Sequence, residues 1–483
     1  MNYRASAPLN NIIIFGIIGI VAILMGKIIT DTSSYILPIL CISAILMLFV
    51  SFIRLEWAIV LLIYAMLLSP ELILGSVSSN REITIRIEDI FLVIFSFLWL
   101  ARAALHKKVQ FLRKTPMNKY LAFYTITFVF ATLKGMLTND VRPVQGTFYI
   151  LKYLEYFIIY FLVVGILKNR KQAVMYIKAF IITFAIVNIY AFTQIGLGGR
   201  VSAPFEGPVG EPNTLGGYQV LLFGVIIGLL SHMSRSKWRW LMALLCVFSF
   251  IPFAYTLSRS SYMSLVPTYL VLVYFNRSRK RNILIGSLFI VLILSFFFFP
   301  KNVKERIMYT FVPQQQQYID PVKVFGVKLG PSASARFKSW EYAIRFWLKR
   351  PVLGYGVTGK GFLDSQFVRT FVELGSLGFI AFLLLLIGVY RNTLRIYHNT
   401  NDGLFKGLAL GFLAGHIGMI MHALTANTFI IIRIMEPYWF LLGIVMMIPE
   451  IDKNEKEKEK DKLTKTVTVD NIRWRSHMNL KNI

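Results

Sequence analysis

Three arginines stand out in this sequence because each lies in a polar segment between long apolar stretches. Arg200 belongs to GLGGRVSAPFEGPVGEPNTLGGY, Arg259 to TLSRSSY and Arg336 to SARFKSWEYAIRFWLKR. An arginine binds phosphate oxygens through paired N–H groups, which a lysine cannot reproduce. Together the three side chains could bind one pyrophosphate, whereas each taken alone could be a cation that reaches the membrane interface from a helix end.

Further polar residues lie inside apolar stretches. Lys152 and Glu155 are three residues apart, so they share a helix face and are expected to form a structural ion pair, although charge at this depth can also mark a functional site. His416 and His422 lie on different faces without carboxylates nearby, which argues against a metal site. His422 is either a proton acceptor or a hydrogen-bonded packing residue. Because the metal, nucleotide and haem patterns are absent from the sequence, we expect no cofactor.

The elements that must position these residues are membrane spans. The chain of 483 residues is 56% hydrophobic and 16% charged, whereas soluble proteins carry about 25% charged residues. A span in lipid must satisfy its own backbone hydrogen bonds, so we predict an all-α polytopic membrane protein with about 14 transmembrane helices. The predicted spans are 11–29, 35–53, 57–73, 88–104, 119–137, 146–166, 175–195, 214–231, 240–256, 262–275, 283–299, 367–390, 407–425 and 430–449.

Alternate connections are rich in Lys and Arg, which indicates that they are cytoplasmic and that both termini are cytoplasmic as well. This distribution accounts for much of the net charge of +28, so the charge does not indicate nucleic-acid binding. The basic connections are 106–119, 168–171, 234–239, 276–281 and 391–395. The predicted outer connections are 71–87, 138–145, 196–213, 257–261, 300–366 and 426–429.

The large outer loop 300–366 carries eleven Lys or Arg against four Asp or Glu. Such a surface suits either an anionic ligand or anionic lipid head groups. Within the loop, 334–350 has the pattern of an amphipathic interfacial helix. The glycine-rich stretch 351–361 is either a phosphate-binding loop or a plain turn.

The predicted organisation has four parts. Residues 1–299 form a membrane domain with spans 1–11, and 300–366 form the extracytoplasmic loop. Residues 367–449 form a second membrane domain with spans 12–14. The mixed-charge tail 450–483 is expected to be a disordered cytoplasmic segment because it has no apolar periodicity.

Four segments resemble the O-antigen ligase/polymerase (Wzy-type) family of bacterial glycan assembly. They occur in the family's order and are RVSAPFEGPVGEPNTLGGY, TLSRSSY, RFKSWEYAIRFWLKRPVLGYG and DSQFVRTFVELGSLGFIAF. The residues that fall on the family pattern are Arg200, Asn213, Arg259, Arg336, Trp340, Gly354, Gly356, Glu373 and Gly375. Ligases of the family typically carry a His-Asn pair where this chain has Asp364 and Ser365, so the resemblance favours a polymerase.

The resemblance implies a multi-pass glycosyltransferase of the bacterial cytoplasmic membrane, with its active face extracytoplasmic. It would transfer glycan from undecaprenyl-pyrophosphate to another lipid-linked unit. Arg200, Arg259 and Arg336 would bind the substrate pyrophosphate. Expected partners are this lipid-linked oligosaccharide, membrane lipid, and a chain-length regulator and flippase of the same pathway, with no nucleic acid.

The acceptor hydroxyl in such a reaction needs a general base. Asp364 is the first candidate, followed by Glu211 and Glu373. The alternative roles are a solvated or ion-paired carboxylate for Asp364 and Glu211, and a buried structural pair for Glu373. Alternative functions are a ligase with a lipid or protein acceptor, a lipid-linked oligosaccharide flippase, and a non-catalytic partner that holds an acidic polymer.

Overall fold

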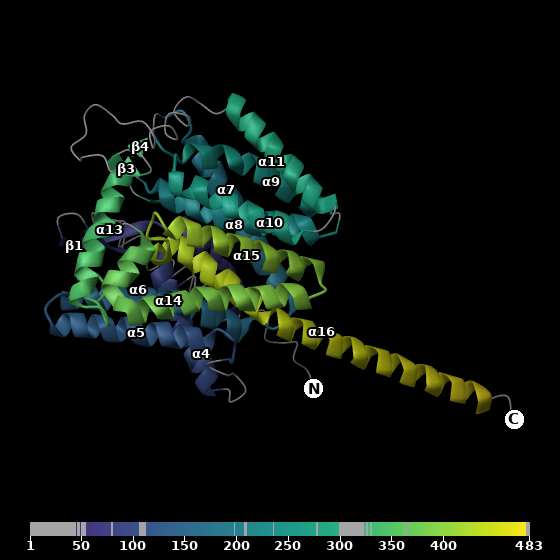
Figure 1. The fold of residues 1–483 in the computed structure, drawn as a ribbon. Coiled ribbons are helices and arrows are strands. Elements are labelled where there is room, and N and C mark those ends of the chain that lie inside the picture. The colour runs from purple at the N-terminus through teal and green to yellow at the C-terminus, as the bar shows by residue number, and fades with distance from the viewer. Residues whose placement is uncertain are drawn as a thin grey trace, which may run out of the picture. The chain divides into compact units, whose positions relative to one another are not determined.

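The computed structural model describes most of the chain from Leu55 to Asn479 and divides it into two compact units, Met1–Val109 and Gln110–Ile483 (Figure 1). We describe each unit by itself. The described residues are Ile45, Phe49, 55–78, 81–105, 113–197, 199–206, 210–234, 236–276, 279–298, 323–324, 327–328, 331–361, 363 and 365–479. The predicted spans 11–29 and 35–53 lie outside them, apart from Ile45 and Phe49.

The first unit contains helix α3 (Leu55–Leu68), a β-hairpin and helix α4 (Ile87–Leu105). The hairpin pairs β1 (Glu71–Ser78) with β2 (Arg81–Arg86) in antiparallel register. The predicted span 57–73 is therefore wrong at its end, because the helix stops at Leu68 and the chain enters a strand. Pro70 explains the stop, since a proline disfavours the helical conformation of the residue before it.

The second unit is a bundle of helices with one short hairpin among its described residues. Its elements are α5 (Asn118–Leu137), α6 (Pro143–Ile166), α7 (Arg170–Thr193), α8 (Pro212–His232), α9 (Lys237–Tyr255), α10 (Arg259–Phe275), α11 (Arg279–Phe298), β3 (Lys323–Val324), β4 (Val327–Lys328), α13 (Pro331–Lys349), α14 (Gln366–Asn399), α15 (Gly403–Ala423), the 3₁₀ turn η1 (Thr428–Ile430) and α16 (Ile432–Asn479). Eight helices in the described part of the chain are long and apolar enough to cross a membrane. They are α5 to α9, α14, α15 and the first part of α16, so the protein is a multi-pass membrane protein.

The centre of this unit is the packing of α8 against α15. The two helices approach so closely because glycines face each other, as is common between helices in membranes. A Cβ atom on Gly224 would lie 2.8 Å from the carbonyl oxygen of Gly411, and one on Gly407 would lie 2.8 Å from that of Gly228. Helix α10 packs against both α8 and α15, which fixes the start of α10 beside the start of α8.

Helix α14 is broken at Gly375, where the backbone has φ 65° and ψ −168°. The glycine-rich turn 351–361 fills this break. Tyr355 N donates to Val372 O at 3.2 Å, Gly356 N to Glu373 O at 2.7 Å, and Ser376 N to Pro351 O at 2.7 Å. The predicted amphipathic helix is confirmed as α13, which stacks Trp347 on Phe371 of α14 with ring centroids 4.7 Å apart.

In the second unit, several contacts join connections that were predicted to lie on the same side of the membrane. Among the predicted outer connections, Arg350 pairs with Asp140, and Gln366 N donates to Ala426 O at 3.1 Å. Among the predicted inner segments, Arg170 pairs with Asp402 at 2.8 Å. We call these two groups the outer end and the inner end; the direction of each relative to the cytoplasm remains a prediction from charge.

The C-terminal segment differs from the prediction of a disordered tail, because α16 continues as a helix to Asn479. Figure 1 shows its C-terminal half extending beyond the other helices of the second unit. Oppositely charged residues four positions apart support a helix that lacks an apolar face. Lys453 and Glu457 form such a pair, with 3.8 Å between Nζ and Oε1.

Candidate functional site

Arg200 lies at the outer end, against the turn that precedes Arg259. Its Nε donates to the carbonyl of Thr256 at 2.9 Å, and its Nη2 donates to the carbonyl of Leu257 at 3.4 Å. The same Nη2 is 3.3 Å from Oδ1 of Asn213 at the start of α8. The structure therefore brings Arg200 and the Arg259 turn together, although they are distant in sequence.

The N-termini of α8 and α10 meet beside Arg200. Helix α8 begins at Pro212, whose missing N–H is harmless at this position. Helix α10 begins at Arg259 behind Ser258, whose hydroxyl accepts from Ser261 N in an N-cap. Ser258 Oγ also donates to Asn213 Oδ1 at 2.8 Å, which joins the two helix starts directly. Two positive helix ends and an arginine at one place form a local environment that favours an anion.

The third predicted arginine, Arg336, lies on α13, and its side chain is outside the described part of the structure. A different arginine, which was not a candidate from the sequence, binds the loop between α7 and α8. Arg433, 1% exposed, donates to Pro204 O at 2.7 Å and to Phe205 O at 3.1 Å. A charged residue at the start of an apolar span was the signal that could have found it.

Glu206 organises the same loop. Its Oε2 accepts from Ala203 N at 3.1 Å and from Glu211 N at 3.0 Å. Burial raises the pKa of the Glu206 carboxyl to about 7, although the charge of Arg433 and the backbone N–H groups act in the opposite direction. The pKa of this carboxyl is therefore raised toward neutral pH, which its place in a polar loop did not indicate.

The three predicted carboxylates have different surroundings. Glu211 is exposed immediately before α8, and its Oε2 accepts from the Thr214 hydroxyl at 2.9 Å. Asp364 lies outside the described residues. Its described neighbours are bound to the turn after α15, because Asn427 Nδ2 donates to Leu363 O at 2.9 Å and Ser365 Oγ to Ala423 O at 3.4 Å.

Glu373 is buried in α14, with 2% of its surface exposed. Arg369 Nε lies 2.9 Å from Glu373 Oε1, and Thr358 N donates to the same oxygen at 2.8 Å. This geometry matches the buried structural pair that was the alternative for Glu373. Arg369 was not among the candidates from the sequence, although its spacing of four residues from Glu373 in an apolar span indicates such a pair.

Several backbone N–H groups of the glycine-rich turn 351–361 donate to other atoms of the protein. Besides the bonds to α14, Val357 N donates to Thr132 Oγ1 at 3.3 Å, and Gly359 N to Gly356 O at 3.0 Å. The geometry favours the plain turn over the phosphate-binding loop. Lys360 Nζ lies 4.3 Å from the centre of the Tyr355 ring and 3.9 Å from Oδ1 of Asp140, which belongs to the connection between α5 and α6.

The membrane histidines have separate surroundings. His416 is a hydrogen-bonded packing residue, since its Nδ1 lies 2.8 Å from the Tyr438 hydroxyl and its Nε2 lies 3.1 Å from Leu386 O. His422 lies near the outer end, with Nε2 3.3 Å from Ser261 Oγ and Nδ1 2.7 Å from Thr428 Oγ1.

The predicted structural ion pair between Lys152 and Glu155 is confirmed, with 3.0 Å between Lys152 Nζ and Glu155 Oε2. In the described part of the chain, no three His, Cys, Asp or Glu residues form a group that could hold a metal ion. The polar residues of the outer end are therefore the candidate site, with Arg200 and the two helix starts at its centre.

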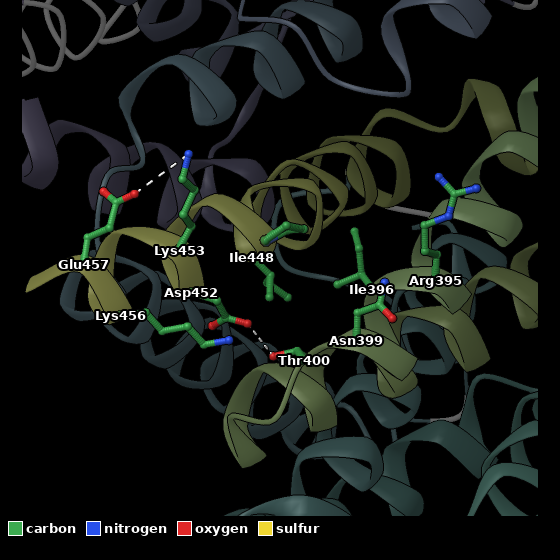
Figure 2. A pocket seen from close by; sticks show the side chains of 10 residues that line it. Arg395, Ile396, Asn399, Thr400, Ile448, Asp452, Lys453, Lys456 and Glu457 are labelled. Carbon is green, nitrogen blue, oxygen red and sulfur yellow. Dashed lines mark hydrogen bonds and ion pairs between the residues drawn. The ribbon is translucent and has the colours of Figure 1, made fainter. Parts of the chain in front are cut away.

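A pocket of about 520 Å³ lies at the inner end, between the C-terminal part of α14 and α16 (Figure 2). Its lining includes Arg395 and Lys456, and Asp452 accepts from the Thr400 hydroxyl at 2.8 Å. These residues come from segments that the charge pattern predicts to be cytoplasmic. The excess of basic residues there is what that prediction implies, and none of the pyrophosphate-binding candidates contributes to the pocket.

One family model matches part of the chain. Residues 244–383 match the family model described as O-antigen ligase. The match reaches from within α9 to within α14 and includes Arg259, Arg336 and Glu373, whereas Arg200 and His422 lie outside it. A search of curated proteins gave no match. The family match supports assignment of the chain to an O-antigen ligase/polymerase-type family.

Proposed function

We propose that this protein polymerises the repeat units of a cell-surface polysaccharide on the outer face of the bacterial cytoplasmic membrane. The donor would be glycan on undecaprenyl-pyrophosphate, and the acceptor would be another lipid-linked unit. One observation carries the proposal: Arg200 meets the starts of α8 and α10 at one place. The O-antigen ligase match over residues 244–383 supports the reaction class.

The chemical demand of this reaction is the departure of a lipid pyrophosphate. Negative charge develops on the leaving oxygen as the glycosidic bond breaks, and fixed cations and N–H dipoles stabilise it. In our proposal Arg200 and Arg259 supply the cations, and the starts of α8 and α10 supply the dipoles. Arg336, on α13, is proposed as the third cation.

The acceptor hydroxyl must lose its proton as it attacks the sugar. Asp364 remains our first candidate for the base, because its neighbours Leu363 and Ser365 are bound to the turn that follows His422. Glu211 is the second candidate because it is exposed next to Asn213. Glu373 is the third, and its burial beside Arg369 favours a supporting role instead.

The test is product analysis with purified protein in liposomes. A short repeat unit on undecaprenyl-pyrophosphate is added, and the released glycans are separated by size. We expect a ladder of multiples of the unit from the unaltered protein. Transfer of the intact lipid to the other leaflet without any ladder would contradict the proposal and indicate a flippase.

A ligase is the second candidate function, because the matching family model carries that description. A ligase would add glycan to a different acceptor, such as a lipid or a protein, and would leave the lipid-linked unit unextended. Adding candidate acceptors to the same liposomes separates the two functions. A single transfer product without a ladder would favour the ligase.

A further inference from the structure

A continuous chain of hydrogen bonds connects the candidate site with the buried His422. It begins at Asn213, whose Oδ1 accepts from Ser258 Oγ at 2.8 Å. Ser258 Oγ lies 2.8 Å from Ser261 Oγ, which lies 3.3 Å from His422 Nε2. The ring's other nitrogen, Nδ1, lies 2.7 Å from Thr428 Oγ1.

The chain has a defined direction because each serine hydroxyl has one proton. Arg200 Nη2 can only donate, so the atom of the Asn213 amide that faces it must be the oxygen. An amide oxygen can only accept, so Ser258 gives its proton to Asn213. With its proton committed, Ser258 Oγ can only accept from Ser260 Oγ at 3.1 Å and from Ser261 Oγ at 2.8 Å, so the bond between Ser258 and Ser261 uses the proton of Ser261.

It follows that the proton between Ser261 and His422 belongs to the histidine. In the neutral ring, Nε2 carries hydrogen and Nδ1 accepts from Thr428. In the charged ring, both nitrogens donate, and Nε2 still points its hydrogen at Ser261. His422 therefore cannot take a proton through Ser261, which argues against its role as the general base.

We propose that His422 is a positioning residue, which acts through Ser261 and Ser258 to fix the amide of Asn213 with its NH₂ group directed at the bound phosphate. This inference rests on the proposed function for the identity of the ligand. Asn213 is exposed, and its Nδ2 has no hydrogen-bond partner among the described residues. Both bonds to Oδ1 turn that NH₂ group away from Ser258 and Arg200.

The packing around His422 has the precision that such a role requires. His422, Ser258 and Ser261 are all 0% exposed. Gly217 of α8 lies beside the ring: a Cβ there would be in van der Waals contact with His422 Cε1 at 3.4 Å and would crowd Ile434 Cδ1 at 2.6 Å. The neighbouring Gly216 leaves room for Ser261, so α8 holds the chain of hydrogen bonds in place.

The first measurement is the tautomer of His422 in the unaltered protein, by ¹⁵N NMR in liposomes with the His422→Asn variant used to assign its signals. We expect protonated Nε2, and a change in its signal in Ser261→Ala. An unprotonated Nε2 would overturn the inference whatever the protein's function, because the direction of the chain would then be wrong.

The second measurement is the affinity for undecaprenyl pyrophosphate without glycan, with the protein in nanodiscs. A hydrogen bond to a charged group contributes about 1.5–3 kcal/mol, so Asn213→Ala is expected to weaken binding roughly 10- to 100-fold. His422→Leu should weaken it by a similar factor, and the double variant should be no weaker than Asn213→Ala. His422→Gln should bind normally, because its amide can donate from near the position of Nε2.

His416 provides the matched control, since it is buried in the same helix but bonded to Tyr438 and Leu386. His416→Leu and His416→Gln should leave the affinity unchanged. Normal binding by His422→Leu, with weakened binding by Arg200→Ala, would overturn this inference and leave the proposed function standing. No binding by the unaltered protein would overturn both.

Discussion

Replacing Glu373 by Gln removes the negative charge that faces Arg369 inside the bundle, while the new side chain can still accept from Thr358 N. Both charged groups are almost fully buried, with side-chain exposures of 1% and 3%. In addition, Nη1 and Nη2 of Arg369 have no hydrogen-bond partner among the described residues. The charge of Arg369 therefore depends on Glu373 for compensation.

The expected cost follows from this burial. Removing one partner of a buried ion pair destabilises a protein by about 3–5 kcal/mol, because the remaining charge is left uncompensated. Glu373→Gln and Arg369→Met should each lose about this much. The double variant has no charge left at this buried position and keeps the acceptor for Thr358 N, so we expect it to regain most of the loss.

Unfolding in mixed micelles, followed for the two single variants and the double variant, measures the coupling energy of the pair. Polymer formation in liposomes by the same samples then separates the two roles of Glu373. If the pair is structural, the double variant forms polymer. A double variant that is stable but inactive would refute the structural interpretation, and single variants as stable as the unaltered protein would refute the argument from burial.

Three other predictions concern the outer end. Arg259→Ala and Arg336→Ala should each abolish polymer formation while the protein reaches the membrane at its normal level. Lysine at either position should restore polymer formation only in part, because a lysine lacks the paired N–H groups. Sizing of the glycans measures both effects. Glu206 has a higher pKa in the folded state than in the unfolded chain, so its contribution to stability should fall as pH rises from about 4.5 to about 7. Thermal unfolding across this range should show that slope, and Glu206→Gln should remove it. Gly375→Ala should lower the unfolding temperature by disrupting the contact with turn 351–361, because its φ is 65° and a Cβ would overlap Val352.

The helices of the bundle were largely predictable, because apolar length and the basic connections between spans are strong signals. The predictions 119–137 and 146–166, for example, correspond to α5 (Asn118–Leu137) and α6 (Pro143–Ile166). Two predictions were wrong because they followed the overall composition of a segment and not its individual residues. The apolar residues of 57–73 predicted one continuous span, although α3 ends at Leu68, just before Pro70. The charges after Glu450 predicted disorder, although oppositely charged side chains there pair along a helix.

The candidate site was predictable only in part. The outer connections that carry Arg200 and Arg259 were identified from charge and polarity, and the structure brings them together. The sequence does not show which backbone N–H groups are already bonded within the protein. The glycines of 351–361 are compatible with a phosphate loop or a turn, and only the break at Gly375 shows where their N–H groups are used.

The start of a helix can be read from sequence, but the meeting of two starts cannot. Pro212 marks the first residue of α8, and Ser258 is a favourable N-cap for α10, so each terminus was a local signal. Their meeting depends on glycines of α8 whose importance appears only once the facing residues are known. Gly216 leaves room for Ser261, and Gly217 leaves room for Ile434 beside His422. The residues that assemble the anion-favouring site are thus small and chemically inert, which is why a search for reactive side chains finds Arg200 but not the packing that positions it.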